Sequence, residues 1–265
     1  MHDHGIADIR NARLAWWSDG DGAGDPLVLV HAGVADARMW EPIVPALAET
    51  RRVVRFDMRG AGQSRSAPGA YSPPGDLAAL LDALAIERAH VVGASWGGLV
   101  ALEFAAAWPD RVASLVLLAA SLSDIDPSPD LMAFAEAEEA AIAVGRVDDA
   151  VQINVRMWAG QSTPQVQALV ADMQRIAFEL QLREHAESDE LDPPVSARLG
   201  AVDVPATVAY GDRDVGDFEQ IARRLHGGLP DATLHEITGA GHLLALDQPD
   251  EVTRLILRHL DRAGG

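Results

Sequence analysis

The chain has 265 residues, of which 48% are hydrophobic, and its formal net charge is -19. The length and the hydrophobic content fit one large folded domain and argue against a disordered protein. The charge predicts that it binds neither nucleic acid nor anionic membranes, because such a surface repels phosphates. The 21 basic residues are all arginine and cysteine is absent, which excludes Schiff-base, thiol, disulfide and cysteine-ligated zinc chemistry.

The N-terminal segment, residues 1–10, has no apolar core of the kind found in a secretory signal. No apolar stretch reaches the roughly 18 to 20 residues that a membrane helix needs. The absence of cysteine also fits a reducing compartment. These features predict a cytoplasmic protein.

Short apolar runs alternate with helical patterns along most of the chain. Apolar runs without polar alternation indicate strands buried on both faces, and their alternation with helices predicts a mostly parallel, doubly wound α/β sheet. The Asp- and Gly-rich residues 19–25 predict a hairpin turn between two strands rather than a calcium loop. The predicted strands are 27–30, 53–56, 90–94, 113–119, 206–210 and 234–237, and the predicted helices are 38–48, 76–85, 97–108, 218–225 and 251–260.

The alternation stops between residues 123 and 197, where we find helical patterns at 133–144, 148–158 and 165–182 and no convincing strand. This stretch contains 15 acidic residues and 4 arginines. It predicts a helical cap over the sheet, although ordinary helices of the core are the alternative. The expected organisation is a core of residues 1–122 and 198–265, interrupted by a cap at 123–197.

The strongest chemical signal is Gly-Ala-Ser-Trp-Gly-Gly at residues 93–98, between a predicted strand and a predicted helix. A serine on a tight strand-to-helix turn exposes its hydroxyl, and small residues two positions before and after let strand and helix approach closely. The helix N-terminus and the N–H of Trp96 would then face a developing oxyanion. The pattern predicts that Ser95 is a nucleophile.

A serine hydroxyl needs a base, and the base needs an orienting acid. In this arrangement the three residues follow one another along the chain in the order serine, acid, histidine. The loop after the last predicted strand offers His242 as the base. The loop after the strand at 206–210 offers Asp214 as the acid. Asp212 follows that strand too closely and is expected to stabilise the turn, while Asp124 is the outside alternative.

The loop that follows the first apolar strand begins at His31. Such loops donate the second oxyanion N–H, and we assign it to Gly33, with Val34 as the alternative. His31 is expected to make structural hydrogen bonds. In the Gly-rich stretch 57–64, Asp57 and Arg59 are available for a local ion pair. The sequence has no dinucleotide fingerprint, phosphate loop or metal-ligand cluster, so no cofactor is expected.

These motifs together resemble the α/β-hydrolase superfamily, and its esterase, lactonase and haloperoxidase-like branch, over nearly the whole chain. The segment 31–40 resembles that of 3-oxoadipate enol-lactonases, which implies an oxyanion hole formed by Gly33 and Trp96. Two positions depart from the common pattern: Ala32 replaces a glycine, and Trp96 stands where methionine is frequent. Both departures leave the predicted chemistry intact and bear on the substrate.

The sequence thus predicts hydrolysis of a small carboxylic ester or lactone by a monomer or homodimer. A lyase or C–C bond hydrolase on the same fold, and a non-catalytic small-molecule receptor, are the alternatives, since fold alone does not decide among them. Arg156 is a candidate for binding a substrate carboxylate, with a surface salt bridge as the alternative. The apolar residues of the predicted cap either line the pocket or only pack the cap: Trp158, Met157, Phe134, Met132, Met173 and Phe178.

Overall fold

The computed structural model describes residues 2–189 and 191–264. Three residues lie outside the described ones: Met1, Glu190 and Gly265. In the predicted division they fall in the first core segment, the cap and the second core segment, respectively. Within the described ranges, no helix combines the length and the apolar character needed to span a bilayer.

A nine-stranded sheet forms the centre of the fold, in the order β1-β2-β4-β3-β7-β8-β10-β11, with β5 paired to β2. From β4 to β11 all neighbours run parallel, whereas β1, β2 and β5 add antiparallel pairs at one edge. The strands are β1 (His2–Ile9), β2 (Ala12–Asp19), β3 (Leu27–Val30), β4 (Val53–Phe56), β5 (Arg65–Ser66), β7 (Ala89–Ala94), β8 (Val112–Leu118), β10 (Ala206–Gly211) and β11 (Ala232–Ile237).

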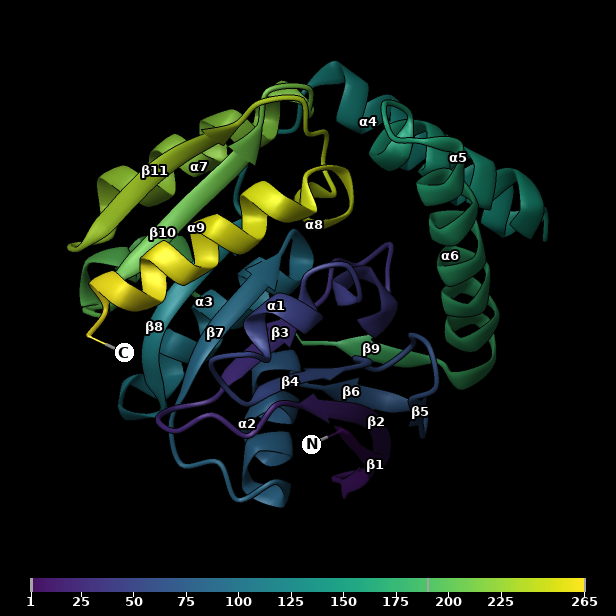
Figure 1. Cartoon of the computed structure of the whole chain (residues 1–265). Helices are drawn as coiled ribbons and strands as arrows, with labels where there is room; N and C mark the ends of the chain where they lie inside the picture. Colours follow the sequence, from purple (N-terminus) through teal and green to yellow (C-terminus); the bar gives the residue numbers. More distant parts are fainter. Residues whose placement is uncertain (1, 190, 265) are drawn as a thin grey trace.

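Helices cover both faces of this sheet, as the sequence predicts (Figure 1). Helices α2 and α3 contact each other on one face, and α1 and α9 contact each other on the other. The predicted helix at 38–48 is instead two short helices, η1 and α1, in a segment that contains Pro42 and Pro45. The core helices are η1 (Ala37–Trp40), α1 (Val44–Leu47), α2 (Pro73–Ala83), α3 (Trp96–Ala107), η2 (Pro109–Arg111), η3 (Val195–Ala201), α7 (Gly216–Gly228), α8 (Leu244–Asp247) and α9 (Pro249–Arg262).

All six predicted strands are present. At the N-terminal edge of the sheet, however, the structure differs from the sequence prediction. Residues 2–19 form the hairpin β1–β2, which the polar sequence did not suggest; it turns at Asn11, whose φ is 56°. The predicted hairpin turn at 19–25 is wrong. This segment links β2 to β3, but β4 lies between those two strands.

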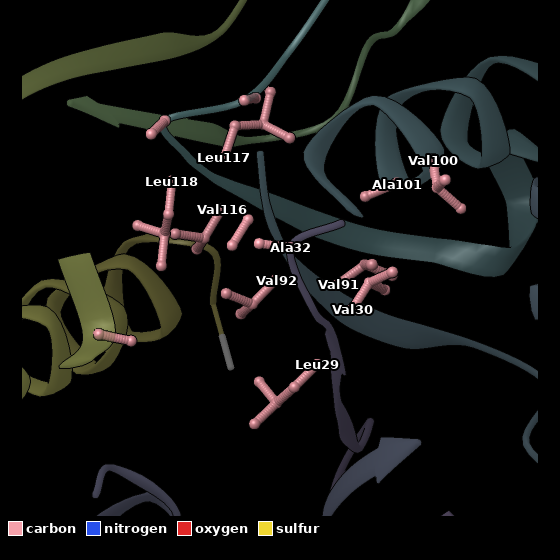
Figure 2. Packing of buried hydrophobic residues seen from close by; sticks show 14 of the residues in the cluster. Leu29, Val30, Ala32, Val91, Val92, Val100, Ala101, Val116, Leu117 and Leu118 are labelled. Carbon is pink, nitrogen blue, oxygen red and sulfur yellow. The ribbon is translucent and has the colours of Figure 1, made fainter. Parts of the chain in front are cut away.

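Branched apolar side chains of the central parallel strands fill the space between the sheet and its helices. Figure 2 shows Leu29, Val92 and Val116 of β3, β7 and β8 on one side of the sheet, and Val30 and Val91 on the other side, toward Val100 and Ala101 of α3. Each of these five strand side chains is at most 1% exposed. Burying one such side chain contributes about 1.5 to 3 kcal/mol, so the packing on both faces holds the strand ends, and the loops that follow them, in fixed positions.

Three long helices interrupt the alternation, at the place where the sequence predicts a cap. They are α4 (Pro129–Ala143), α5 (Val147–Ala159) and α6 (Pro164–Glu184), and they lie together to one side of the sheet (Figure 1). We call α4–α6 the three-helix segment. A short strand that the sequence pattern missed follows it: β9 (Ala186–Ser188) pairs in parallel with β6 (Gly69–Tyr71).

Polar contacts join the three-helix segment and the residue before it to the core helices α7 and α8. The Ser128 N–H donates to Asp217 at 2.8 Å. The Ser162 hydroxyl donates to Asp247 at 2.6 Å. These contacts fix the segment near the loops that end β10 and β11.

A buried polar chain crosses the sheet away from those loops. The Ser114 hydroxyl lies 2.7 Å from a ring nitrogen of His90 and 2.7 Å from one of His259, and His259 in turn lies 2.8 Å from Thr207. Burial is the main cause that lowers the pKa of His90 to about 4 and of His259 to about 3. Both rings are therefore neutral in the folded protein at neutral pH.

This chain predicts a loss of stability in mild acid. Because the folded-state pKa of His259 lies below its usual 6.5, its contribution to stability is complete above pH 6.5 and is lost as the pH falls toward 3. When the pH is lowered from 7.5 to 5.5, we expect the free energy of unfolding to fall by about 1 kcal/mol less in His259→Gln than in the unmodified protein. Urea unfolding at both pH values measures this. His226→Gln, at an exposed position of α7, is the control, and an unchanged pH dependence for His259→Gln would contradict the assignment.

Candidate active site

Ser95 lies on a sharp turn between β7 and α3. Its φ of 52° and ψ of -121° are strained for a non-glycine residue. The glycines around it are required by close approach: a Cβ added at Gly93 would lie 2.3 Å from the Gly97 carbonyl oxygen, and one added at Gly97 would lie 2.3 Å from the His31 carbonyl oxygen. The predicted close packing of strand and helix around this turn is therefore present.

Three side chains from separate loops meet at this turn. The His242 Nε2 atom lies 2.8 Å from the Ser95 Oγ atom, and the His242 Nδ1 atom lies 2.9 Å from Asp214 Oδ2. The side chains of His242 and Asp214 are each 2% exposed. The other Asp214 oxygen accepts the Val215 N–H at 2.7 Å. The arrangement can move a proton from the serine hydroxyl to an imidazole that a buried carboxylate orients.

The alternative acids lie elsewhere. Asp124 forms an ion pair with Arg224 at 2.7 Å and accepts the Ser196 hydroxyl at 2.6 Å, and neither contact involves His242. Asp212 accepts the Gly239 N–H at 2.7 Å, so it stabilises the turn, as expected. Of the three carboxylates considered, only Asp214 contacts the histidine.

His31 makes the structural hydrogen bonds that the sequence suggested. Its Nε2 atom accepts the Met58 N–H at 2.9 Å, and its Nδ1 atom lies 2.8 Å from the Ala32 carbonyl oxygen. Burial is the main cause that lowers the pKa of His31. With both ring nitrogens engaged, His31 is not available as a base.

The expected ion pair between Asp57 and Arg59 is not formed, which corrects that prediction. Asp57 accepts the N–H groups of Ala37 and Gln63 instead, and burial raises the pKa of Asp57 to about 6. Arg59 pairs with Asp76, with Nη2 2.8 Å from Oδ1. Asp57 and Arg59 thus contact different partners, and each stabilises part of the loop at 57–64.

Gly33 and Trp96 lie next to each other, since a Cβ added at Gly33 would be 3.6 Å from the Trp96 Cβ. Among the hydrogen bonds of the described residues, neither backbone N–H has a protein acceptor. The same is true of Val34, so the geometry leaves that alternative open. Both candidate donors are free for a ligand oxygen.

A cavity of about 630 Å³ opens beside His242 and Asp214. It is lined by residues of α4 and α5, including Phe134, Arg156, Met157 and Trp158. The Trp158 ring centroid lies 4.5 Å from that of His242. We call this the histidine-side cavity.

The remaining apolar candidates divide between pocket and packing. Met173 and Phe178 are buried, and the Met173 sulfur accepts the Asp36 N–H, so they pack the segment. Met132 is 47% exposed and does not line the histidine-side cavity. The predicted alternative for Arg156 is wrong, because its guanidinium forms no salt bridge within the described ranges.

A second cavity of about 340 Å³ adjoins Gly33 and Trp96. We call it the oxyanion-side cavity. Tyr71, Gln181 and Glu184 line it, and burial raises the pKa of Tyr71 to about 12.

Sequence reasoning missed these three residues, and it also missed Phe218, whose ring centroid lies 4.2 Å from that of His242. A signal for Phe218 was available, because it lies one helical turn after Asp214 on a helix that begins at the same loop. Tyr71, Gln181 and Glu184 gave no such signal, since they come from β6 and α6, which are far apart in the sequence. Among the residues that the structure describes, no group of three or more His, Asp or Glu side chains could hold a metal ion.

Comparison with known proteins identifies the fold family. A sequence profile of the alpha/beta hydrolase fold matches residues 25–249. The chain belongs to the α/β-hydrolase family. The match spans the Ser95 turn and both loops that carry Asp214 and His242.

Relatives of this α/β hydrolase differ in the reactions for which they are named. RutD of Variovorax paradoxus, provisionally named as a carbamate hydrolase, is 31% identical over 262 residues, 89% of this chain and 91% of that protein. A 2-hydroxy-6-oxo-2,4-heptadienoate hydrolase of Pseudomonas putida is 42% identical over 106 residues, 37% of this chain and 38% of that one. The enol-lactonase of Burkholderia xenovorans LB400 has a similar structure, with a TM-score of 0.80 and 24% identity over 97% of this chain and 100% of that one.

Proposed function

We propose that this α/β hydrolase cleaves a small carboxylic ester or lactone through an acyl-enzyme. The observation that carries the proposal is the continuous contact from Ser95 through His242 to Asp214. One cavity is lined by His242 and Asp214, and another by Gly33 and Trp96. His242 takes the Ser95 proton, and Asp214 orients the ring and stabilises the imidazolium.

The reaction then follows from the groups around the serine. Ser95 Oγ attacks the carbonyl carbon, and the N–H groups of Gly33 and Trp96 hold the oxyanion, each donor lowering the barrier by about 3 kcal/mol. His242 gives its proton to the leaving oxygen. Water, activated by the same histidine, then cleaves the acyl-enzyme and frees Ser95.

The three-helix segment is proposed to act as the cap of this site. Its Trp158 and the core residue Phe218 flank the His242 ring. Two aromatic rings against an imidazole keep bulk water from it and hold it toward Ser95. The walls that α4 and α5 give to the histidine-side cavity would then set substrate choice.

C–C bond hydrolysis is the second candidate, because the heptadienoate hydrolase shares 42% identity with part of this chain. The experiment is stopped-flow hydrolysis of p-nitrophenyl acetate, with a ring-fission diketone assayed in parallel. We expect ester turnover with an initial burst of about one p-nitrophenol per chain, since the acyl-enzyme accumulates. Turnover of the diketone alone would favour the C–C hydrolase, and tight ligand binding without turnover of either would favour a receptor.

A further inference from the structure

We propose that the histidine-side cavity takes the alcohol part of the ester, and that Arg156 and Arg213 bind an anionic group, such as a carboxylate, on that alcohol. This inference rests on the proposed ester hydrolysis and names its substrate class: esters of hydroxy acids.

The position of His242 decides which cavity holds the leaving alcohol. When the tetrahedral intermediate collapses, the bond between the carbonyl carbon and the alcohol oxygen breaks, and that oxygen takes the proton that His242 received from Ser95. Proton transfer requires the oxygen to lie within hydrogen-bond reach of Nε2. The cavity lined by His242 and Asp214 therefore receives the alcohol, and the acyl part lies toward Gly33 and Trp96.

Unpaired arginines give this cavity its charge preference. In a chain with 40 acidic residues, most guanidinium groups have a hydrogen-bond or ion-pair partner. Within the described ranges, only four lack one: Arg10, Arg156, Arg198 and Arg213. Two of these four line the histidine-side cavity, one from α5 and one from the loop before Asp214.

The acidic groups in the same cavity do not occupy these guanidinium groups. Asp214 is already engaged by His242 and the Val215 N–H. Asp130 also lines the cavity but pairs with neither arginine. The formal charges of the two arginines and the two aspartates balance, but both guanidinium groups keep unpaired donors, and guanidinium binds carboxylate with two parallel hydrogen bonds.

The oxyanion-side cavity offers no unpaired guanidinium. Its one arginine, Arg59, already pairs with Asp76. The Glu184 carboxylate in its wall accepts the Ser66 N–H at 3.0 Å and lies 3.8 Å from the guanidinium of Arg183. An anion there would find no free cation, so the negative group belongs on the alcohol rather than on the acyl part.

The test compares two esters with the same acetyl group, 4-acetoxybenzoate and its uncharged amide, 4-acetoxybenzamide. The measured quantity is the ratio of their kcat/KM values. Arg156→Leu should lower the ratio of the charged to the uncharged ester by about tenfold, the range of one charge-assisted hydrogen bond. Arg198→Leu removes an equally unpaired arginine outside the cavity and should leave the ratio unchanged. Arg213 is not used for this test, since its neighbour Asp214 contacts His242.

An equal effect of Arg156→Leu on both esters, or the same drop in Arg198→Leu, would overturn the anion site while leaving ester hydrolysis intact. A second measurement does not depend on turnover. Calorimetric binding of 4-hydroxybenzoate should be about tenfold weaker in Arg156→Leu than in Arg198→Leu. If neither ester is hydrolysed, the proposed function fails, and equal affinities in the two variants would then overturn the anion site as well.

Discussion

Ser95→Ala is expected to lower kcat for p-nitrophenyl ester hydrolysis by at least about a thousandfold. Without the hydroxyl, the carbonyl carbon has no protein nucleophile, while His242 and the candidate oxyanion donors stay in place. A residual rate above that in water is therefore expected. Alanine tolerates the positive φ of 52° as well as serine does, so we expect the thermal unfolding midpoint to change little.

Ser196→Ala is the matched control for that variant. Its hydroxyl donates to Asp124 on the surface, and its removal should leave kcat unchanged. Steady-state kinetics on both variants decide the matter. Retention of activity by Ser95→Ala would remove the serine from the mechanism, whatever its geometry.

Asp214→Asn is expected to lower kcat by about ten thousandfold at neutral pH. An amide in place of the carboxylate can offer its NH₂ group to His242 Nδ1, and the proton then moves to Nε2, the atom that must accept the Ser95 proton. It also removes the negative charge that stabilises the imidazolium. The buried site, in which both side chains are 2% exposed, leaves no water to replace that charge.

Asp124→Asn separates the two acids between which the sequence left a choice. Asp124 holds Arg224 and Ser196 rather than His242, so its variant should keep wild-type kcat. The kcat values of the two variants are compared with that of the unmodified protein at one pH. A large loss in Asp124→Asn together with a small one in Asp214→Asn would reverse the assignment of the acid.

Much of the fold was predictable because the local hydrophobic pattern of the sequence agrees with where each segment lies in the sheet. The apolar runs at 27–30 and 53–56 coincide with β3 and β4, since a strand buried on both faces needs apolar residues at every position. The turn at Ser95 was predictable because the close approach of strand and helix leaves no room for a side chain at Gly93 or Gly97, and both glycines are visible in the sequence. Chain order then placed the base and the acid on successive loops.

Other features depend on long-range pairing, which a local pattern does not encode. The hairpin β1–β2 lies at the edge of the sheet, where side chains such as His2 and His4 are exposed and no buried alternation marks the strands. The walls of the oxyanion-side cavity combine Tyr71 with Glu184, which are far apart in sequence. Their meeting depends on the pairing of β6 with β9, two strands of three residues each.

The ion pairs of the arginines were equally hidden from sequence. Arg59 was expected to pair with its neighbour Asp57 and pairs with Asp76 of α2 instead. For Arg156 a surface salt bridge was the alternative to binding a substrate, and its guanidinium has no such partner in the described part of the chain. Which carboxylate a guanidinium reaches is decided by packing between elements, and the charge of each cavity follows from those choices.

The central claim, that Ser95 is the activated nucleophile, is tested most directly by covalent trapping. The protein is incubated with diethyl p-nitrophenyl phosphate, which transfers a diethylphosphoryl group to a serine activated by a neighbouring base, with release of p-nitrophenol. Intact-protein and peptide mass spectrometry should find one diethylphosphoryl group per chain, on Ser95, with a parallel loss of esterase activity and no labelling of Ser95→Ala. Loss of activity with Ser95 unmodified and the group on another residue would contradict the account.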